Sequence, residues 1–156
     1  EEIGGFDETL VRNQDYELNW RLRQAGHTVW FDPNLKVEYS PRATLNQLAS
    51  QYFEYGSWKR RVILRNPKSL KIRQLAPPIL LFGLSISILL LLLQNLYGLT
   101  IPLIYFTSLL IASSLVKETL KLRERLLLLF AFATMHLAWA AGFLFGRNKS
   151  RKTQVK

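Results

Sequence analysis

The sequence has 156 residues, which is enough for one compact domain or for one domain with an appendage. Lys and Arg number 21 against 11 Asp and Glu, a formal net charge of +10, yet 49% of the residues are hydrophobic. This composition excludes disorder as the overall state, and the absence of cysteine excludes disulfide frameworks, thiolate metal sites and cysteine nucleophiles. The only methionine is Met135 and residue 1 is Glu, so we expect this sequence to be part of a longer translated chain.

The charge changes sign along the chain. Residues 1–58 carry a formal charge of −4, and residues 59–156 carry +14. A step of this size indicates two different environments. The basic residues border apolar segments and do not spread over a polar surface, so we expect membrane lipids as a partner and do not expect nucleic acid.

The first part of the chain, residues 1–42, has the pattern of an α/β fold. Asn13 can cap a helix over about 14–25. Residues 28–31 and 35–39 then have the composition of short strands, and an Asp-Pro-Asn turn separates them. A helix followed by two strands buries too little apolar surface by itself, so this part is predicted to be the end of a larger sheet domain.

The next part, residues 43–74, is predicted to contain an amphipathic helix and a linker. Thr44 and Gln47 form a capping box at the start of a helix that continues to about Leu64, where basic residues follow. An amphipathic helix with aromatic residues and a basic end, just before a spanning segment, is expected to lie along the lipid headgroups. The alternative is an ordinary helix that packs on the preceding domain.

The third part, residues 75–146, is predicted to be a helical membrane region, followed by a basic tail at 147–156. A run of 43 residues, 74–116, lacks any charged side chain, and a second charge-free run covers 126–146. The hydrocarbon core of a bilayer is about 30 Å thick, and helices of about 35, 27 and 30 Å would fit it. These predicted helices cover about 75–97, 99–116 and 126–145.

Basic residues border each apolar segment: seven lie in residues 59–73, four in 117–125 and five in 147–156. By the positive-inside rule, all three borders favour the cytoplasmic side. Three crossings cannot satisfy that preference. Two crossings followed by a re-entrant or interfacial third segment would satisfy it, and three crossings remain the alternative if the short tail ends on the other side.

The third apolar segment carries a histidine and a stripe of small residues. Ala138, Gly142 and Gly146 repeat every four residues, a pattern suited to close helix packing. His136 has two interpretations. It is either a contact to a lipid phosphate or pyrophosphate, or a polar group bonded to a neighbouring helix.

Six short motifs follow one another in a characteristic order. They are residues 4–8 (GGFDE), 13–22 (NQDYELNWRL), 25–27 (AGH), 30–33 (WFDP), 51–59 (QYFEYGSWK) and 136–143 (HLAWAAGF). Together they resemble family 2 glycosyltransferases, in particular the membrane-anchored succinoglycan type of exopolysaccharide biosynthesis. The resemblance covers essentially the whole chain.

The resemblance implies a fold and an activity. Residues 1–42 would be the acceptor-side end of a GT-A catalytic domain, on the cytoplasmic side of a bacterial inner membrane that the chain crosses several times. The enzyme would transfer a sugar, with inversion, from a nucleotide sugar to a glycan or lipid-linked acceptor. The alternative from another class is a non-enzymatic membrane module that binds a partner or anionic lipid.

The resemblance also assigns a catalytic base. Asp15 matches the position of the carboxylate that takes the proton of the acceptor hydroxyl. The family's acidic dyad has Gln14 as its first member here, which removes a neighbouring negative charge. Near a helix N-terminus the macrodipole favours an ionised carboxylate, although an acidic residue there is also common as a stabilising charge.

Further roles follow from the same resemblance. Gln51 and Trp58 match an acceptor-binding element with altered spacing, and Arg60 and Arg61 could meet diphosphate or anionic lipid. A divalent metal, Mg or Mn, is expected for the whole enzyme, but no Asp-x-Asp motif occurs in the chain. Residues 1–156 alone are therefore expected neither to bind a sugar nucleotide nor to turn over.

Overall fold

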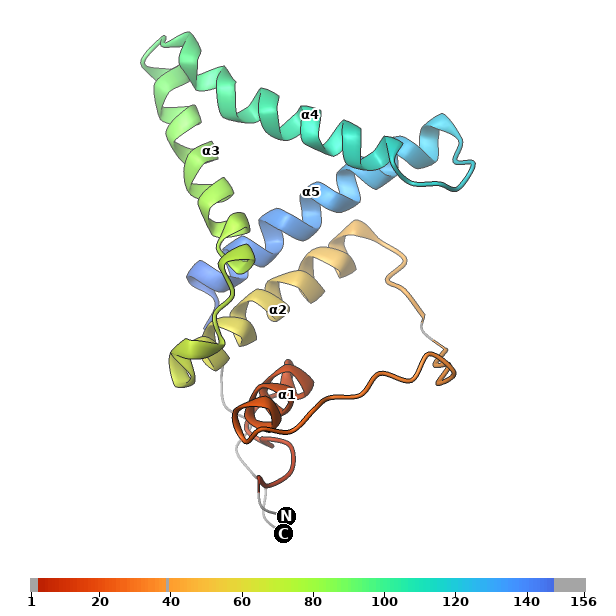
Figure 1. Ribbon diagram of the computed structural model, residues 1–156. Helices are drawn as coiled ribbons and strands as arrows, with labels where there is room; N and C mark the ends of the chain where they lie inside the picture. Colours follow the sequence, from red (N-terminus) through yellow and green to blue (C-terminus); the bar gives the residue numbers. More distant parts are fainter. Residues whose placement is uncertain (1–2, 39, 148–156) are drawn as a thin grey trace.

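The computed structural model describes residues 3–38 and 40–147. All regular structure in these ranges is helical (Figure 1). The elements in chain order are α1 (Gln14–Gln24), α2 (Leu45–Arg65), η1 (Pro67–Ser69), η2 (Ile72–Gln74), α3 (Ala76–Leu92), η3 (Leu96–Leu99), α4 (Thr100–Ser114) and α5 (Leu122–Phe145).

The predicted strands do not form in the described part of residues 28–39, so the α/β prediction is wrong there. The described part of the chain offers no strand beside this segment, and a strand without a neighbour leaves its backbone donors and acceptors unpaired. Its apolar side chains are also uncovered: Trp30 is 86% exposed, Phe31 82% and Val37 87%. Residue 39 lies outside the described residues.

The first helix begins where the sequence predicts, but its N-terminus is built differently. Asn13 adopts the left-handed conformation, with φ 62° and ψ 23°, and makes no side-chain capping bond. Its amide Nδ2 instead donates to the carbonyl oxygen of Tyr55 at 3.2 Å. Asparagine tolerates this conformation better than most residues. Asn13 therefore ties the start of α1 to α2.

A small core joins α1 to α2. Leu10, Trp58 and Val62 are buried together, with Tyr16 packed against them. The Tyr16 hydroxyl donates to the carbonyl oxygen of Ser69, so α1 also contacts η1. Burial of these apolar groups, at about 25 cal/mol per Å², is the main force that holds α1 in place.

The second helix forms as the capping box predicts. The Thr44 hydroxyl accepts a hydrogen bond from the backbone amide of Gln47 at 3.2 Å, and α2 runs from Leu45 to Arg65. One side of α2 contacts α1, and another side packs along α5. Figure 1 shows α2 and α5 side by side, running in the same direction.

Glycines allow α2 and α5 to touch backbone to backbone. A Cβ at Gly56 would overlap the carbonyl oxygen of Trp139 and lie 2.8 Å from the amide nitrogen of Phe143. A Cβ at Gly142 would overlap the carbonyl group of Phe53. Real Cβ contacts are not this short, so only glycine fits at either position. The small-residue stripe predicted in α5 thus packs on α2.

The three apolar helices form a triangle in which α5 is the side nearest α2 (Figure 1). The first predicted membrane helix ends at Leu92, earlier than residue 97, because Gln94 has a positive φ of 56° and Asn95 accepts a bond from the Tyr97 amide at 3.0 Å. Within residues 3–38 and 40–147, two helical segments are long and apolar enough to cross a membrane, Leu96–Ser114 and Leu122–Phe145, whereas α3 is a shorter apolar helix of 17 residues. Membrane crossing itself stays a prediction.

We expect Gly56→Ala to lower the free energy of unfolding by about 1–3 kcal/mol or more, because the new methyl group must separate α2 from α5. Thermal unfolding followed by circular dichroism in detergent micelles measures the change. Gly5→Ala is the matched control, since nothing lies within 4 Å of a Cβ there, and it should change stability by less than about 0.5 kcal/mol. Equal melting temperatures for the two variants would contradict the contact.

Candidate functional site

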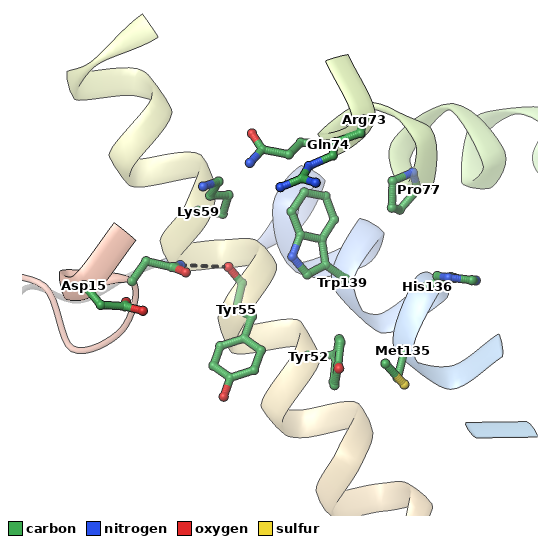
Figure 2. A pocket seen from close by; sticks show the side chains of 11 residues that line it. Asp15, Tyr52, Tyr55, Lys59, Arg73, Gln74, Pro77, Met135, His136 and Trp139 are labelled. Carbon is green, nitrogen blue, oxygen red and sulfur yellow. Dashed lines mark hydrogen bonds between the residues drawn. The ribbon is translucent and has the colours of Figure 1, made fainter. Parts of the chain in front are cut away.

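A cleft of about 580 Å³ lies where α1, α2, η2, the start of α3 and α5 meet (Figure 2). It is open to the surface, and both charged and aromatic side chains line it. The lining residues are Asn13, Asp15, Tyr52, Tyr55, Lys59, Arg73, Gln74, Pro77, Met135, His136 and Trp139.

Asp15, the predicted catalytic base, lies in this cleft. It belongs to the first turn of α1 and its side chain is exposed. The bond from Asn13 to Tyr55, drawn in Figure 2, fixes the turn that precedes it. Gln14 does not line the cleft, because its side-chain amide donates to the carbonyl oxygen of Leu10 at 2.5 Å. The Asp15 carboxylate thus lines the cleft, and the side chain of Gln14 does not.

Lys59 is the most buried charged group of the cleft. Its side chain is on α2, the residue is 5% exposed, and its Nζ lies over the ring of Tyr16, 2.6 Å from the ring centroid. The pKa of Lys59 is lowered from 10.5 to about 7, mainly by burial and also by nearby Lys71 and Arg73, while Asp15 opposes the shift. An anion in the cleft would favour the protonated form of Lys59.

Aromatic side chains form the apolar part of the cleft. Trp139 stacks on Phe143, with ring centroids 5.2 Å apart and planes 11° apart, and Tyr52 meets Tyr55 edge-on at 5.6 Å. In the view of Figure 2, Trp139 lies between Asp15 and His136. Flat aromatic faces of this kind bind apolar and cationic groups.

His136 combines features of both interpretations drawn from the sequence. Its Nδ1 lies 3.1 Å from the hydroxyl of Tyr105 on α4, so it is bonded to a neighbouring helix. The same imidazole also lines the cleft that holds Asp15 and Lys59. Contact with a phosphate group stays a prediction.

The other predicted site residues lie elsewhere. Gln51 donates to the hydroxyl of Tyr55 at 2.7 Å and faces a smaller, polar cleft of about 230 Å³. Trp58 is 6% exposed and belongs to the core between α1 and α2. Arg60 donates to the carbonyl oxygen of Leu144 at 3.0 Å, and the Arg61 guanidinium lies 5.3 Å from the Trp58 ring centroid. Their roles toward an acceptor stay predictions.

Sequence reasoning missed two cations of the cleft. Lys59 follows Trp58 in the 51–59 motif, and Arg73 is the last basic residue before the first apolar run. Their nearness to Asp15 had no signal in the sequence, because 44 and 58 positions separate them from it. Only the packing of α1 on α2 and η1 brings these groups together.

The expected divalent metal has no ligand set in the part of the chain that the structure describes. No cluster of three or more His, Asp or Glu side chains occurs within residues 3–38 and 40–147. In the cleft, Asp15 is accompanied by the cations Lys59 and Arg73, which do not bind metal ions when protonated. We therefore derive no step through a metal ion.

Two kinds of curated protein are similar to this chain. Over 75 residues, 48% of this chain, it is 37% identical to the succinoglycan biosynthesis protein ExoA of Rhizobium meliloti, of which the match covers 23%. Over 66 residues, 42% of this chain, it is 32% identical to the pre-mycofactocin glycosyltransferase of Mycobacterium tuberculosis, of which the match covers 14%. The chain thus spans less than a quarter of the length of these relatives. No family model and no solved structure matches it.

The shifted pKa of Lys59 predicts a specific pH dependence. Between about pH 7 and 10.5 the unfolded chain holds a proton that folded Lys59 has lost, so stability rises with pH across this window. Lys59→Met should make the rise smaller, and Lys36→Met, at an exposed position, should leave it unchanged. Melting temperatures of the three proteins in detergent at pH 6.5 and 9.5 test this. The same pH dependence in all three would show that Lys59 has an ordinary pKa.

Proposed function

We propose that this chain is part of a membrane-associated inverting glycosyltransferase, with Asp15 as the general base. The observation that carries the proposal is the cleft in which an exposed carboxylate, two cationic side chains and an aromatic face meet. The similarity to proteins named for succinoglycan biosynthesis and for glycosyl transfer supports it. The sequence motifs alone did not indicate that these side chains line one cleft.

The proposed reaction needs one proton acceptor beside the sugar acceptor. The acceptor hydroxyl gives its proton to the Asp15 carboxylate as its oxygen attacks the anomeric carbon of the donor sugar. The bond from that carbon to the nucleotide diphosphate breaks on the opposite face, and the diphosphate takes the electron pair. Asp15 has access to the cleft and is not held in any ion pair shorter than 4 Å among the described residues.

Lys59 and Arg73 are the cations placed to meet an anionic part of a substrate. Both line the same cleft as Asp15, whereas Arg60 and Arg61 do not. Charge developing on a leaving diphosphate is stabilised most by cations that are already in position in a partly dry site. Burial of Lys59 under Tyr16 supplies such a position.

The acceptor we propose is a lipid-linked glycan, in bacterial exopolysaccharide biosynthesis. The cleft reaches Pro77 at the start of α3, and apolar side chains on α3 and α4 are widely exposed. In this proposal the protein is a multi-pass protein of the inner membrane, and its catalytic part faces the cytoplasm, where nucleotide sugars are made. A non-enzymatic membrane module is the second candidate, favoured by the same exposed apolar faces.

Asp15→Asn should lower sugar transfer by about 10²- to 10⁴-fold, because the amide cannot take a proton. The measurement is transfer from a panel of radiolabelled nucleotide sugars in membranes that contain the whole protein. Glu8→Gln is the control, since Glu8 is an exposed carboxylate of the same segment outside the cleft. Undiminished transfer by Asp15→Asn, with normal membrane insertion, would show that Asp15 is not the base. No transfer by the unsubstituted whole protein would favour the non-enzymatic module.

Arg73→Gln and Arg60→Gln separate the cations inside the cleft from those outside it. Loss of one charge-assisted bond to a substrate costs about 1.5–3 kcal/mol, so Arg73→Gln should lower kcat/KM by about 10- to 100-fold. Arg60→Gln should change it by less than about threefold. A larger loss of kcat/KM in Arg60→Gln than in Arg73→Gln would instead assign anion binding to Arg60 and Arg61.

A further inference from the structure

The structure bears on a question that the basic borders leave open, namely whether the chain crosses the membrane twice or three times. A helix that crosses a bilayer has its two ends at opposite borders. The position of α5 relative to the start of α3 and to the end of α4 therefore decides whether α5 can cross.

The C-terminal half of α5 lies at the border where α3 begins. Arg73, Gln74 and Pro77 share the cleft with His136 and Trp139. The basic end of α2, which leads into α3, lies beside the same half of α5: Arg60 donates to the carbonyl oxygen of Leu144 at 3.0 Å. Figure 1 shows the start of α3 and the end of α5 at the same corner of the triangle.

The N-terminal end of α5 lies where α4 ends. The Arg125 guanidinium donates to the carbonyl oxygen of Ser113 at 2.8 Å, and the Ser113 hydroxyl lies 3.5 Å from the carbonyl oxygen of Arg125. If α3 and α4 each cross the bilayer, the end of α4 is back at the border where α3 began, and both ends of α5 are then at one border.

We infer that α3 and α4 form a hairpin that crosses the membrane twice, and that α5 lies along the lipid surface between the bilayer and α2. The inference rests on the membrane insertion in the proposed function. With α5 at the surface, the number of crossings within α3–α5 is two, and Gly146, which follows α5, is on the side of α1 and α2.

The contact between α2 and α5 supports this arrangement. At Gly56 and Gly142 the two helices touch backbone to backbone, so α2 and α5 must lie at the same depth relative to a bilayer. If α5 crossed the bilayer, Glu54 and Lys59 of α2 would enter the hydrocarbon with it, at about 2.5–3.5 kcal/mol for each charge. With α5 along the surface, α2 covers one face of α5 and stays among the headgroups.

Charge along the chain agrees with two crossings. The basic clusters at 59–73, 117–125 and 147–156 all fall on one side when α5 stays at the surface. The turn between α3 and α4, residues 93–99, carries no charged side chain and falls on the other side. Three crossings would place the last cluster on that other side.

Single cysteines test the topology, because residues 1–156 contain none. Any cysteine elsewhere in the whole protein is first replaced by serine. Suitable positions are Ser50→Cys on α2, Tyr97→Cys in the α3–α4 turn, Thr119→Cys between α4 and α5, and Ser150→Cys near the end of the sequence. A membrane-impermeant maleimide is applied to intact cells and to inverted vesicles that contain the whole protein. Labelling after solubilisation in detergent normalises each position.

We expect Ser50→Cys, Thr119→Cys and Ser150→Cys to be labelled from one side and Tyr97→Cys from the other, with at least a tenfold preference in each case. Labelling of Ser150→Cys from the side of Tyr97→Cys would establish three crossings and overturn the inference. Release of the protein by alkaline carbonate, with equal labelling at all positions, would instead refute membrane insertion. Transfer activity is scored separately, so failure of Asp15 as the base leaves this result unaffected.

Discussion

The contact between the backbones of α2 and α5 is the constraint on which the rest of the structure depends. Gly56 and Gly142 leave no room for a side chain, so the two helices lie closer than ordinary side-chain packing allows. That contact sets the position of Trp139 and His136 opposite α2, and α2 in turn carries α1 through Trp58 and Val62. Every wall of the cleft is thus positioned directly or indirectly by one interface.

The cleft derives its electrostatic character from groups that are far apart in the sequence. Lys59 is forced under Tyr16 by the packing of α1, and burial brings the pKa of Lys59 to about 7. Arg73 lies at the border of the apolar region, and Asp15 lies in the first turn of α1. A carboxylate near two cations, one of them able to change charge near neutral pH, suits a reaction that moves a proton and releases an anion.

The same interface joins the more polar first half of the chain to the apolar helices. Because α2 must stay with α5, a helix with ionisable groups and a helix of apolar residues share one depth. In the arrangement that we infer, both helices lie at the surface of the bilayer, where apolar residues face the lipid and charges reach water. Of the two predicted alternatives for α2, packing on the preceding part of the chain is observed through Trp58 and Val62, and an interfacial position stays a prediction.

The sequence by itself determined the helices. The capping box at Thr44, the turn residues around Asn95 and the uninterrupted apolar runs are local signals, and α2, α3, α4 and α5 all form within or close to the predicted ranges. Local signals gave a wrong prediction at residues 28–39. A strand is stabilised by a neighbouring strand, and an alternation of apolar and polar residues does not by itself supply one. The motif also located Asp15. Only the tertiary structure decided three further features: the nearness of Lys59 and Arg73 to Asp15, the burial of Trp58 in the core, and the contacts that the two ends of α5 make with α4 and α2. Each depends on which helices touch, and the spacing of residues along the chain does not encode such contacts.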